Sequence, residues 1–148
     1  MTYRITSHDE PSDQAALDLV DTGIGDYNDA AEPRLSEVRH LSCIARDDMG
    51  AAVGGAVGRT WGDNAELQQL WLPDALRSHG LGRALLSVFE DGARKRGCTL
   101  TYLETWSFQA RDFYEKCGYT VALELSGYAP DLSKFTMTKR LRSELLQR

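Results

Sequence analysis

Residues 77–97, RSHGLGRALLSVFEDGARKRG, place a short glycine loop directly before an amphipathic stretch. Gly80 and Gly82 let the chain turn tightly and bring its backbone close to a ligand. The first N–H groups of a helix have no partner within the helix, and the helix start carries partial positive charge. Arg77 and Arg83 add guanidinium groups that can pair with phosphate oxygens. The loop therefore predicts a pyrophosphate site, with a plain surface turn as the alternative.

The residues after the loop predict a helix over 81–95. Apolar side chains recur along it at spacings of three and four, which is the pattern of a helix with one buried face. These side chains are Leu81, Ala84, Leu85, Val88, Phe89 and Ala93. Gly97 follows as a stop signal at the C-terminal end. The segments 66–72 and 99–105, which flank the loop and the helix, predict strands.

The rest of the chain continues in strand and helix patterns on both sides of this unit. Strands are predicted over 2–6, 41–46, 51–61, 119–125 and 133–139, and helices over 15–20, 34–38, 110–116 and a last turn within 140–148. Residues 23–32 lack periodicity and predict an irregular segment, and residues 47–50 predict a hairpin loop. Gly54, Gly55 and Gly58 share one strand, where glycine indicates a bulge, a close neighbour or simple tolerance.

This order of elements predicts a mixed α/β fold. The glycine loop follows the fourth predicted strand, whereas a dinucleotide-binding fold has its glycine turn after the first strand and an acidic residue about 20 residues later. The doubly wound nucleotide fold is therefore excluded. We expect one domain over residues 1–148, because a chain of 148 residues can bury enough surface around a single core.

Composition narrows the class of protein further. The net charge of −5 argues against a nucleic-acid surface and favours a cationic small substrate. No apolar run approaches the roughly 20 residues of a membrane span, so we expect a soluble cytoplasmic protein with no membrane partner. Cys43, Cys98 and Cys117 form no paired motif, which is typical of reduced thiols. The three histidines are too scattered along the chain for a metal site, so we expect none.

Two segments together resemble the GNAT superfamily of acetyl-CoA-dependent N-acetyltransferases. Arg77-Ser78-His79-Gly80-Leu81-Gly82 is similar to the family's acyl-CoA loop, Arg/Gln-x-x-Gly-x-Gly/Ala. Residues 110–119, ARDFYEKCGY, are similar to its Ala-x-x-x-Tyr-x-x-x-Gly-Phe helix and strand. The resemblance covers roughly residues 41–141, and the order and structural context of the two motifs agree.

The resemblance implies a mostly antiparallel central sheet flanked by helices, in which two central strands splay apart. The strand carrying Leu70 and Leu72 would diverge from the strand holding Thr105, and the pantetheine of acetyl-CoA would enter the gap. Main-chain groups around Leu72 would bind pantetheine, and one N–H there could face the acetyl carbonyl. The backbone donors that the family places on the pyrophosphate are those of Ser78, His79, Gly80, Leu81, Gly82 and Arg83.

The resemblance also implies catalytic roles. Tyr114 stands where the family often has a tyrosine that donates a proton to the departing CoA thiolate, with simple aromatic packing as the alternative. The family commonly has an asparagine seven residues earlier that contacts the cofactor, and here Ser107 occupies that position, with Gln109 as a substitute. Glu66 is the first candidate for the base that takes the amine proton, and Glu104 the second. Either carboxylate could instead be a solvated charge at a strand edge.

Aromatic residues outside these motifs have two interpretations. Trp61, Trp71, Trp106 and Tyr27 could line a pocket for the acceptor, or they could pack in the core.

The leading hypothesis is an enzyme that moves acetyl from acetyl-CoA to a primary amine of a small, cationic molecule, by direct attack in a ternary complex. The alternative is an acyl-CoA-binding sensor or interaction module with weak or no turnover. A third hypothesis is a phosphate- or nucleotide-binding protein in which the tyrosine motif is coincidental. The resemblance further implies a homodimer.

Overall fold

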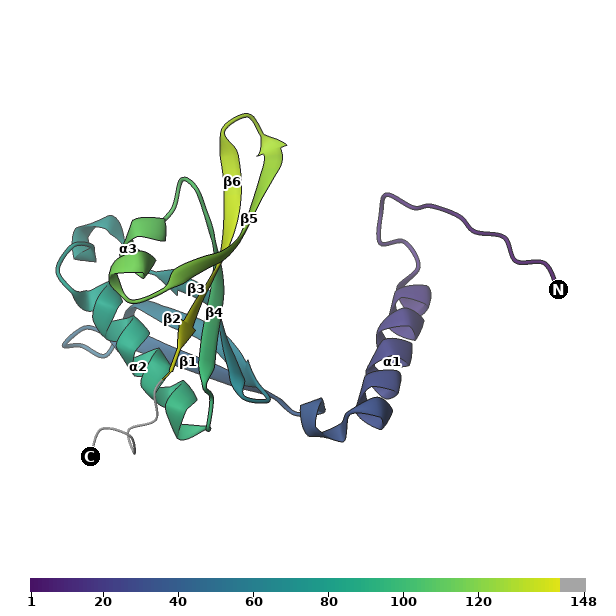
Figure 1. The fold of residues 1–148 in the computed structure, drawn as a ribbon, viewed down its shortest axis with the longest axis horizontal. Coiled ribbons are helices and arrows are strands. Elements are labelled where there is room, and N and C mark those ends of the chain that lie inside the picture. The colour runs from purple at the N-terminus through teal and green to yellow at the C-terminus, as the bar shows by residue number, and fades with distance from the viewer. Residues whose placement is uncertain (142–148) are drawn as a thin grey trace. The chain divides into compact units, whose positions relative to one another are not determined.

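The computed structural model describes residues 1–141, which divide into two compact units, 1–36 and 37 onward. Figure 1 shows the elements of both units. The last helical turn predicted within 140–148 falls mostly on residues 142–148, outside the described residues. Within residues 1–141, no helix is long and apolar enough to cross a membrane. The single domain expected over 1–148 stays a prediction.

The first unit consists of helix α1, Gln14–Ala31, and the short 3-10 helix η1, Pro33–Leu35. The carboxylate of Asp13 caps α1 by accepting a hydrogen bond from the Ala16 N–H at 3.0 Å. The prediction of a helix over 15–20 followed by an irregular segment was wrong, because α1 continues to Ala31. Two glycines within α1 each cost a helix only about 1 kcal/mol, and no proline interrupts it, because Pro11 precedes its start and Pro33 follows its end.

Two further predictions for the first 40 residues were wrong. Residues 2–6 form no strand in the described structure, although their side chains alternate as a strand would. Alternation is a local signal, whereas a strand also needs a partner for its backbone groups. The helix expected over 34–38 is reduced to η1, and β1, Val38–Arg46, begins immediately after it.

The second unit is built on a six-stranded sheet with the order β1-β2-β3-β4-β6-β5. β3 and β4 are parallel, and the other neighbouring strands are antiparallel. After β1, the remaining strands are β2 (Ala52–Trp61), β3 (Asn64–Trp71), β4 (Leu100–Trp106), β5 (Thr120–Ala129) and β6 (Leu132–Arg140). The other helices are η2 (Asp74–Leu76), α2 (Leu81–Lys95) and α3 (Arg111–Lys116). This mixed, mostly antiparallel sheet with flanking helices confirms the predicted fold class.

Helix α2 forms the core of the second unit with the strands β1, β2 and β3. Leu85, Phe89 and Ala93 of the predicted stripe are buried, whereas Ala84 and Val88 are exposed and Leu86, which lies outside the predicted stripe, is buried. The glycines of β2 make this packing possible. A Cβ at Gly58 would lie 2.9 Å from Cζ of Phe89 and 1.9 Å from the carbonyl oxygen of Glu66. Glycine is therefore required there by close neighbours rather than merely tolerated.

The two central strands separate halfway along their length. Pairing between β3 and β4 ends at Leu67 and Leu103. At the same point Gln68 is an extra residue in β3, because Val57 of β2 pairs with Gln69 and the next residue, Gly58, pairs with Leu67. Such a bulge bends the strand that carries it. Beyond Gln68, β3 stays with β2, whereas β4 stays with β6 as far as Trp106. This separation confirms the splayed strands of the predicted fold class.

Candidate active site

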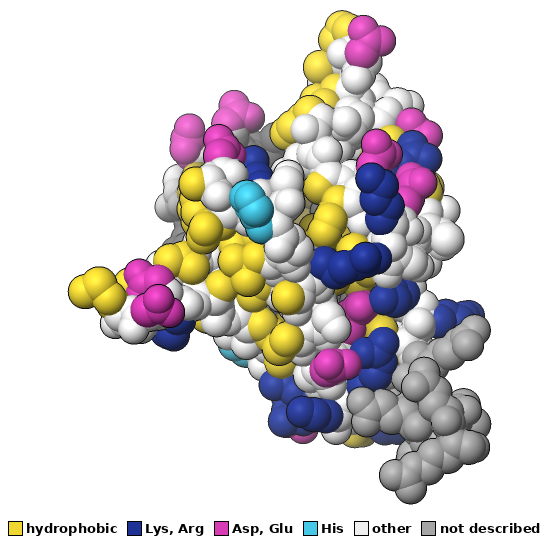
Figure 2. Space-filling model, turned by 90° about the vertical axis from the view of Figure 1, so that its left-hand side faces the viewer, with side chains coloured by type: hydrophobic (Ala, Val, Ile, Leu, Met, Phe, Trp, Pro, Cys, Tyr) yellow, Lys and Arg dark blue, Asp and Glu magenta, His cyan; other side chains and the backbone are white. Residues whose placement is uncertain are grey.

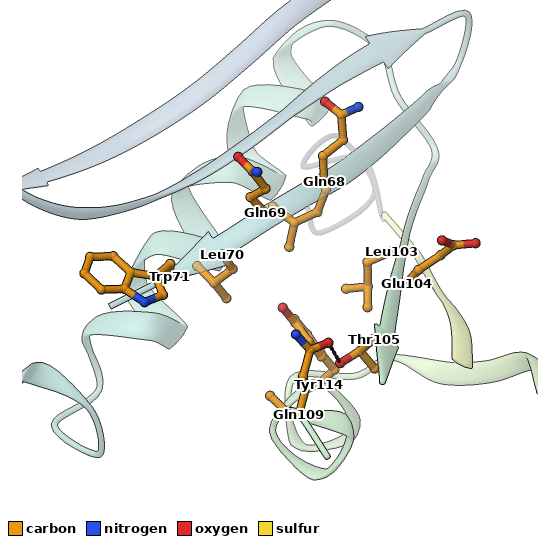
Figure 3. Close-up of a pocket in the computed structure, with 11 residues that line it drawn as sticks. Gln68, Gln69, Leu70, Trp71, Leu103, Glu104, Thr105, Gln109 and Tyr114 are labelled. Carbon is orange, nitrogen blue, oxygen red and sulfur yellow. Dashed lines mark hydrogen bonds between the residues drawn. The ribbon is translucent and has the colours of Figure 1, made fainter. Parts of the chain in front are cut away.

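A cavity of about 570 Å³ occupies the space between the separating strands. Its walls come from the second half of β3, the second half of β4 and the start of α3. Figure 3 shows Tyr114 and Gln109 lying between the ends of the two strands. The lining residues are Leu67, Gln68, Gln69, Leu70, Trp71, Leu103, Glu104, Thr105, Gln109, Ala110 and Tyr114.

A second cavity of about 480 Å³ lies along the glycine loop. Leu70 and Ala110 line both cavities, so the two adjoin and can hold different parts of one elongated ligand. Figure 2 views the side on which α2 and α3 lie in Figure 1, and it shows apolar side chains beside a group of basic ones. The lining residues are Leu70, Leu72, Arg77, Ser78, Gly80, Gly82, Arg83, Ala110, Phe113, Lys116 and Cys117.

The backbone of the glycine loop is shaped to bind an anion. Ser78 has a φ of +63° and Gly80 a φ of +84°, so two residues of the loop adopt the left-handed conformation. Ser78 does so with a side chain, which costs about 1–2 kcal/mol. Within residues 1–141, no backbone carbonyl accepts a hydrogen bond from the N–H groups of residues 78–83. These donors and the start of α2 together form a concave, partially positive site.

The two arginines that flank the loop are held by the protein itself. Arg77 donates from Nε to the carbonyl oxygen of Leu72 at 2.9 Å and pairs with Asp74 at 2.8 Å. Arg83 donates to the carbonyl oxygen of Lys116 at 2.8 Å and thereby joins the start of α2 to the end of α3. Both arginines still line the second cavity, so they brace the loop while contributing positive charge beside it.

The remaining predicted contact residues divide into two groups. Leu70 and Leu72 line the second cavity, and Leu72 is buried. His79 and Leu81 do not line either cavity, although their backbone N–H groups belong to the loop. If these two residues bind the cofactor, they do so through their backbone N–H groups and not through their side chains.

Tyr114 belongs to the first cavity, and the preceding residue, Phe113, lines the second. The side chain of Tyr114 is 8% exposed. The rings of Phe113 and Tyr119 make edge contacts with it, at centroid distances of 5.2 and 5.8 Å. Burial, and to a smaller extent the nearby Cys117, raises the pKa of Tyr114 to about 12. The phenol is therefore protonated at neutral pH and can act as a hydrogen-bond donor.

Ser107 and Gln109 have different positions. Ser107 donates its N–H to the carbonyl oxygen of Ser133 at 2.8 Å, and its hydroxyl accepts from the Ser133 N–H at 3.1 Å. It thereby ties the end of β4 to β6 and lines neither cavity. Gln109 lines the first cavity, and its Oε1 accepts hydrogen bonds from the Trp106 N–H at 2.9 Å and the Thr105 hydroxyl at 3.4 Å. Its amide NH₂ is consequently the part left to bind a ligand.

The two candidate bases are both paired with cations. Glu66 accepts from Nε of Arg59 at 2.6 Å and is absent from the lining of the first cavity. Glu104 lines that cavity and pairs with Nζ of Lys134 at 2.6 Å. The structure thus places Glu104 closer to the cleft than Glu66, and the role of either as a base stays a prediction.

Gln68 and Gln69 were not identified as site residues from the sequence. Both line the first cavity, because the bulge at Gln68 turns this part of β3 toward the gap. The sequence signal that could have indicated this part of the site is the glycine-rich strand β2, because its Gly58 lies opposite the bulge in β3. Within residues 1–141, no group of three or more His, Cys, Asp or Glu side chains is arranged to hold a metal ion.

The fold, the splayed strands and the anion-binding loop define an acetyltransferase of the GNAT type. A model of the Acetyltransferase (GNAT) family matches residues 5–119, and the chain belongs to this family.

Individual relatives support this assignment. The chain is 38% identical over 85 residues to acetyltransferase Atu2258 of Agrobacterium fabrum, an alignment that covers 57% of this chain and 62% of that protein. It is 34% identical over 126 residues to blasticidin-S acetyltransferase of Streptomyces morookaense, covering 77% of this chain and 93% of that protein. The crystal structure of an acetyltransferase from Bacillus cereus superposes with a TM-score of 0.81 at 26% identity, covering 91% and 98% of the two chains.

Proposed function

We propose that this protein transfers the acetyl group of acetyl-CoA to a primary amine of a small molecule, by direct attack in a ternary complex. The observation that carries the proposal is the pair of adjoining cavities. One lies along a loop whose backbone N–H groups have no carbonyl partner within residues 1–141, and the other lies between the separated strands and is lined by Tyr114. We call the cavity along the loop the donor end and the cavity between the strands the acceptor end, where the pantetheine would enter the gap along β3 and bring its thioester to the acceptor amine.

At the donor end, the N–H groups of residues 78–83 would bind the pyrophosphate of acetyl-CoA. The pantetheine would extend from there past Leu72 and Leu70, where β3 has left β4 and its main-chain groups on that edge can pair with amides. The Leu72 N–H would then face the acetyl carbonyl. Losing one such donor to a developing oxyanion typically costs about 10²- to 10³-fold in rate.

Tyr114 would supply a proton to the CoA sulfur as it leaves. A phenol with a pKa of about 12 holds its proton across the neutral range. Charge that builds on the sulfur in the transition state strengthens the hydrogen bond from the phenol, so the residue acts on the chemical step.

Glu66 and Glu104 are the two candidates for accepting the proton of the amine. Each carboxylate is already paired with a cation, Glu66 with Arg59 and Glu104 with Lys134. Glu104 has the advantage of lining the cavity, whereas Glu66 would have to act through water.

A small molecule is favoured as the acceptor. The volume of the acceptor end lies within the usual range of small-molecule pockets. The relative from Streptomyces morookaense, which the chain matches over most of that protein's length, carries the name of blasticidin S. We retain the homodimer and the cytoplasmic location as further proposals, which sedimentation and cell fractionation would test.

Release of free thiol from acetyl-CoA across a panel of primary amines tests the proposal, with calorimetry to measure CoA binding separately. We expect CoA to bind and at least one amine to accelerate thiol release. CoA binding without thiol release from any amine would favour the sensor or interaction module. Absence of CoA binding would overturn both of these functions.

A further inference from the structure

Three aromatic side chains meet beside the acceptor end, and we call them the aromatic cluster. Trp106 ends β4, Phe108 belongs to the turn that follows, and Tyr128 lies near the end of β5. The rings of Trp106 and Phe108 are nearly parallel, with centroids 6.1 Å apart. The ring of Tyr128 meets Trp106 edge-on at 4.7 Å.

This cluster is not part of the core. Phe108 is 71% exposed and Tyr128 is 51% exposed. Two distant segments, 106–108 and the end of β5, thus bring large apolar rings together, with Trp106 partly buried and the other two rings mostly in water. Grouped exposed apolar side chains are commonly used for binding. Aromatic rings suit this purpose because they have a large flat face and few rotatable bonds.

Two contacts connect the cluster to the acceptor end. Nζ of Lys134 lies 5.5 Å from the centroid of Trp106 and 2.6 Å from the carboxylate of Glu104, which lines the cavity. The backbone N–H of Trp106 donates to Gln109, which lines the same cavity. A ligand that reaches past Glu104 or Gln109 therefore comes next to the rings.

The charges nearby do not point to a polycation as the ligand. Each of the two carboxylates on this side, Glu66 and Glu104, has a cationic partner at 2.6 Å. Their negative charge is largely balanced by Arg59 and Lys134. Selectivity at this end is then better explained by the flat aromatic surface than by a net negative potential.

We propose that the aromatic cluster binds a planar ring carried by the acceptor, so that aromatic or heteroaromatic primary amines are the preferred acceptors. This inference rests on the proposed function and specifies the substrate class of the same site. The amino group lies at the acceptor end near Glu104, and the ring packs against Trp106 and Phe108. Stacking of one ring on another contributes enough binding free energy to change affinity by about tenfold.

The test compares two primary amines of similar length, 2-phenylethylamine and n-hexylamine, as acceptors in the thiol-release assay. We expect the wild-type protein to have a higher kcat/KM for the aromatic amine. Phe108→Ala should lower kcat/KM for 2-phenylethylamine by about tenfold and that for n-hexylamine by less than about twofold. Met49→Ala, in the exposed hairpin loop between β1 and β2, is the control and should change neither value.

Each outcome bears on a different statement. If the wild-type protein acetylates both amines, and Phe108→Ala and Tyr128→Leu lower kcat/KM for the two amines equally or not at all, the ring-binding proposal is overturned. The acetyltransferase function then stands. No transfer to any amine overturns both. If instead the two variants convert a dimer into a monomer in sedimentation, a second copy of the chain covers the cluster, and the proposal is again overturned.

Discussion

The donor end and the acceptor end of the cleft are built from different chemical groups. The donor end combines the backbone N–H groups of one continuous loop, which two arginines brace, with residues of β3 and α3. The acceptor end is lined by side chains from β3, β4, α3 and the turn before α3, and its Glu104 is paired with Lys134 of β6. A backbone site tolerates side-chain changes that keep the loop conformation, whereas a side-chain site depends on each residue. We therefore expect mutations at the two ends to have separable effects.

The largest effect is expected at Tyr114, which lines the acceptor end. Tyr114→Phe removes the phenol but keeps the ring that packs against Phe113 and Tyr119. We expect kcat to fall by about 10²-fold with little change in either KM, because the proton is needed in the transition state. Steady-state kinetics with both substrates varied will measure this. A variant with wild-type kcat, when the chemical step limits the rate, would show that Tyr114 only packs.

Stability at high pH provides the next test of the same residue. The pKa of Tyr114 is raised to about 12 in the folded protein, against about 10 for an exposed tyrosine. The folded state thus holds this proton more tightly than the unfolded state, so its contribution is present below pH 10 and is lost as the pH rises toward 12. We expect wild type to lose about 2 kcal/mol more stability than Tyr114→Phe across this range. Urea unfolding at pH 8 and at pH 11–12 compares the two proteins, and equal losses would place the hydroxyl in water.

A change in the conformation of the glycine loop should affect the donor end and leave the acceptor end unchanged. Gly80 and Gly50 both have positive φ, at +84° and +83°, and a Cβ on either would meet nothing within 4 Å. Replacing either glycine with alanine should therefore lower the free energy of unfolding of the protein by about 1–2 kcal/mol. We expect only Gly80→Ala to raise the KM for acetyl-CoA, by about tenfold, and the KM for the amine to stay unchanged. An equal rise in Gly50→Ala would attribute the effect to stability rather than to the loop.

The smallest effect is expected at the acceptor end. Glu104→Gln removes one charge from an ion pair that is partly exposed, and such pairs contribute no more than about 1 kcal/mol. We expect kcat/KM for the amine to fall by about threefold and the KM for acetyl-CoA to be unaffected. Glu66→Gln is the matched variant, because its carboxylate is also paired at 2.6 Å but does not line the cavity. A larger loss in Glu66→Gln than in Glu104→Gln would assign the base to Glu66.

Prediction from the sequence succeeded where the signal was local. The bounds of α2 and the hairpin between β1 and β2 agree with the structure to within a residue or two. The glycine loop was found because its ligand groups are backbone atoms of consecutive residues. The length of α1 was underestimated, because two glycines weaken a helix without ending it.

Prediction was weakest where the signal depends on distant segments. Gln68 and Gln69 carry no motif and enter the cleft only because a bulge bends β3. Ser107 was placed at a cofactor contact by resemblance, yet its hydroxyl accepts a hydrogen bond from Ser133, 26 residues away. No pattern in the residues around Ser107 predicts a hydrogen bond to a residue that far away in the sequence.

The sequence alone determined that this chain has a mixed α/β fold with a glycine loop before a helix that has one buried face, and it indicated the GNAT resemblance. These features depend on residues that are adjacent or one helical turn apart, so a short stretch of sequence contains all the residues that cause them. The tertiary structure decided where the strands separate, which carboxylate reaches the cleft, and that Trp106, Phe108 and Tyr128 meet beside it. Such contacts arise from the packing of segments far apart in sequence, and packing is a property of the whole fold.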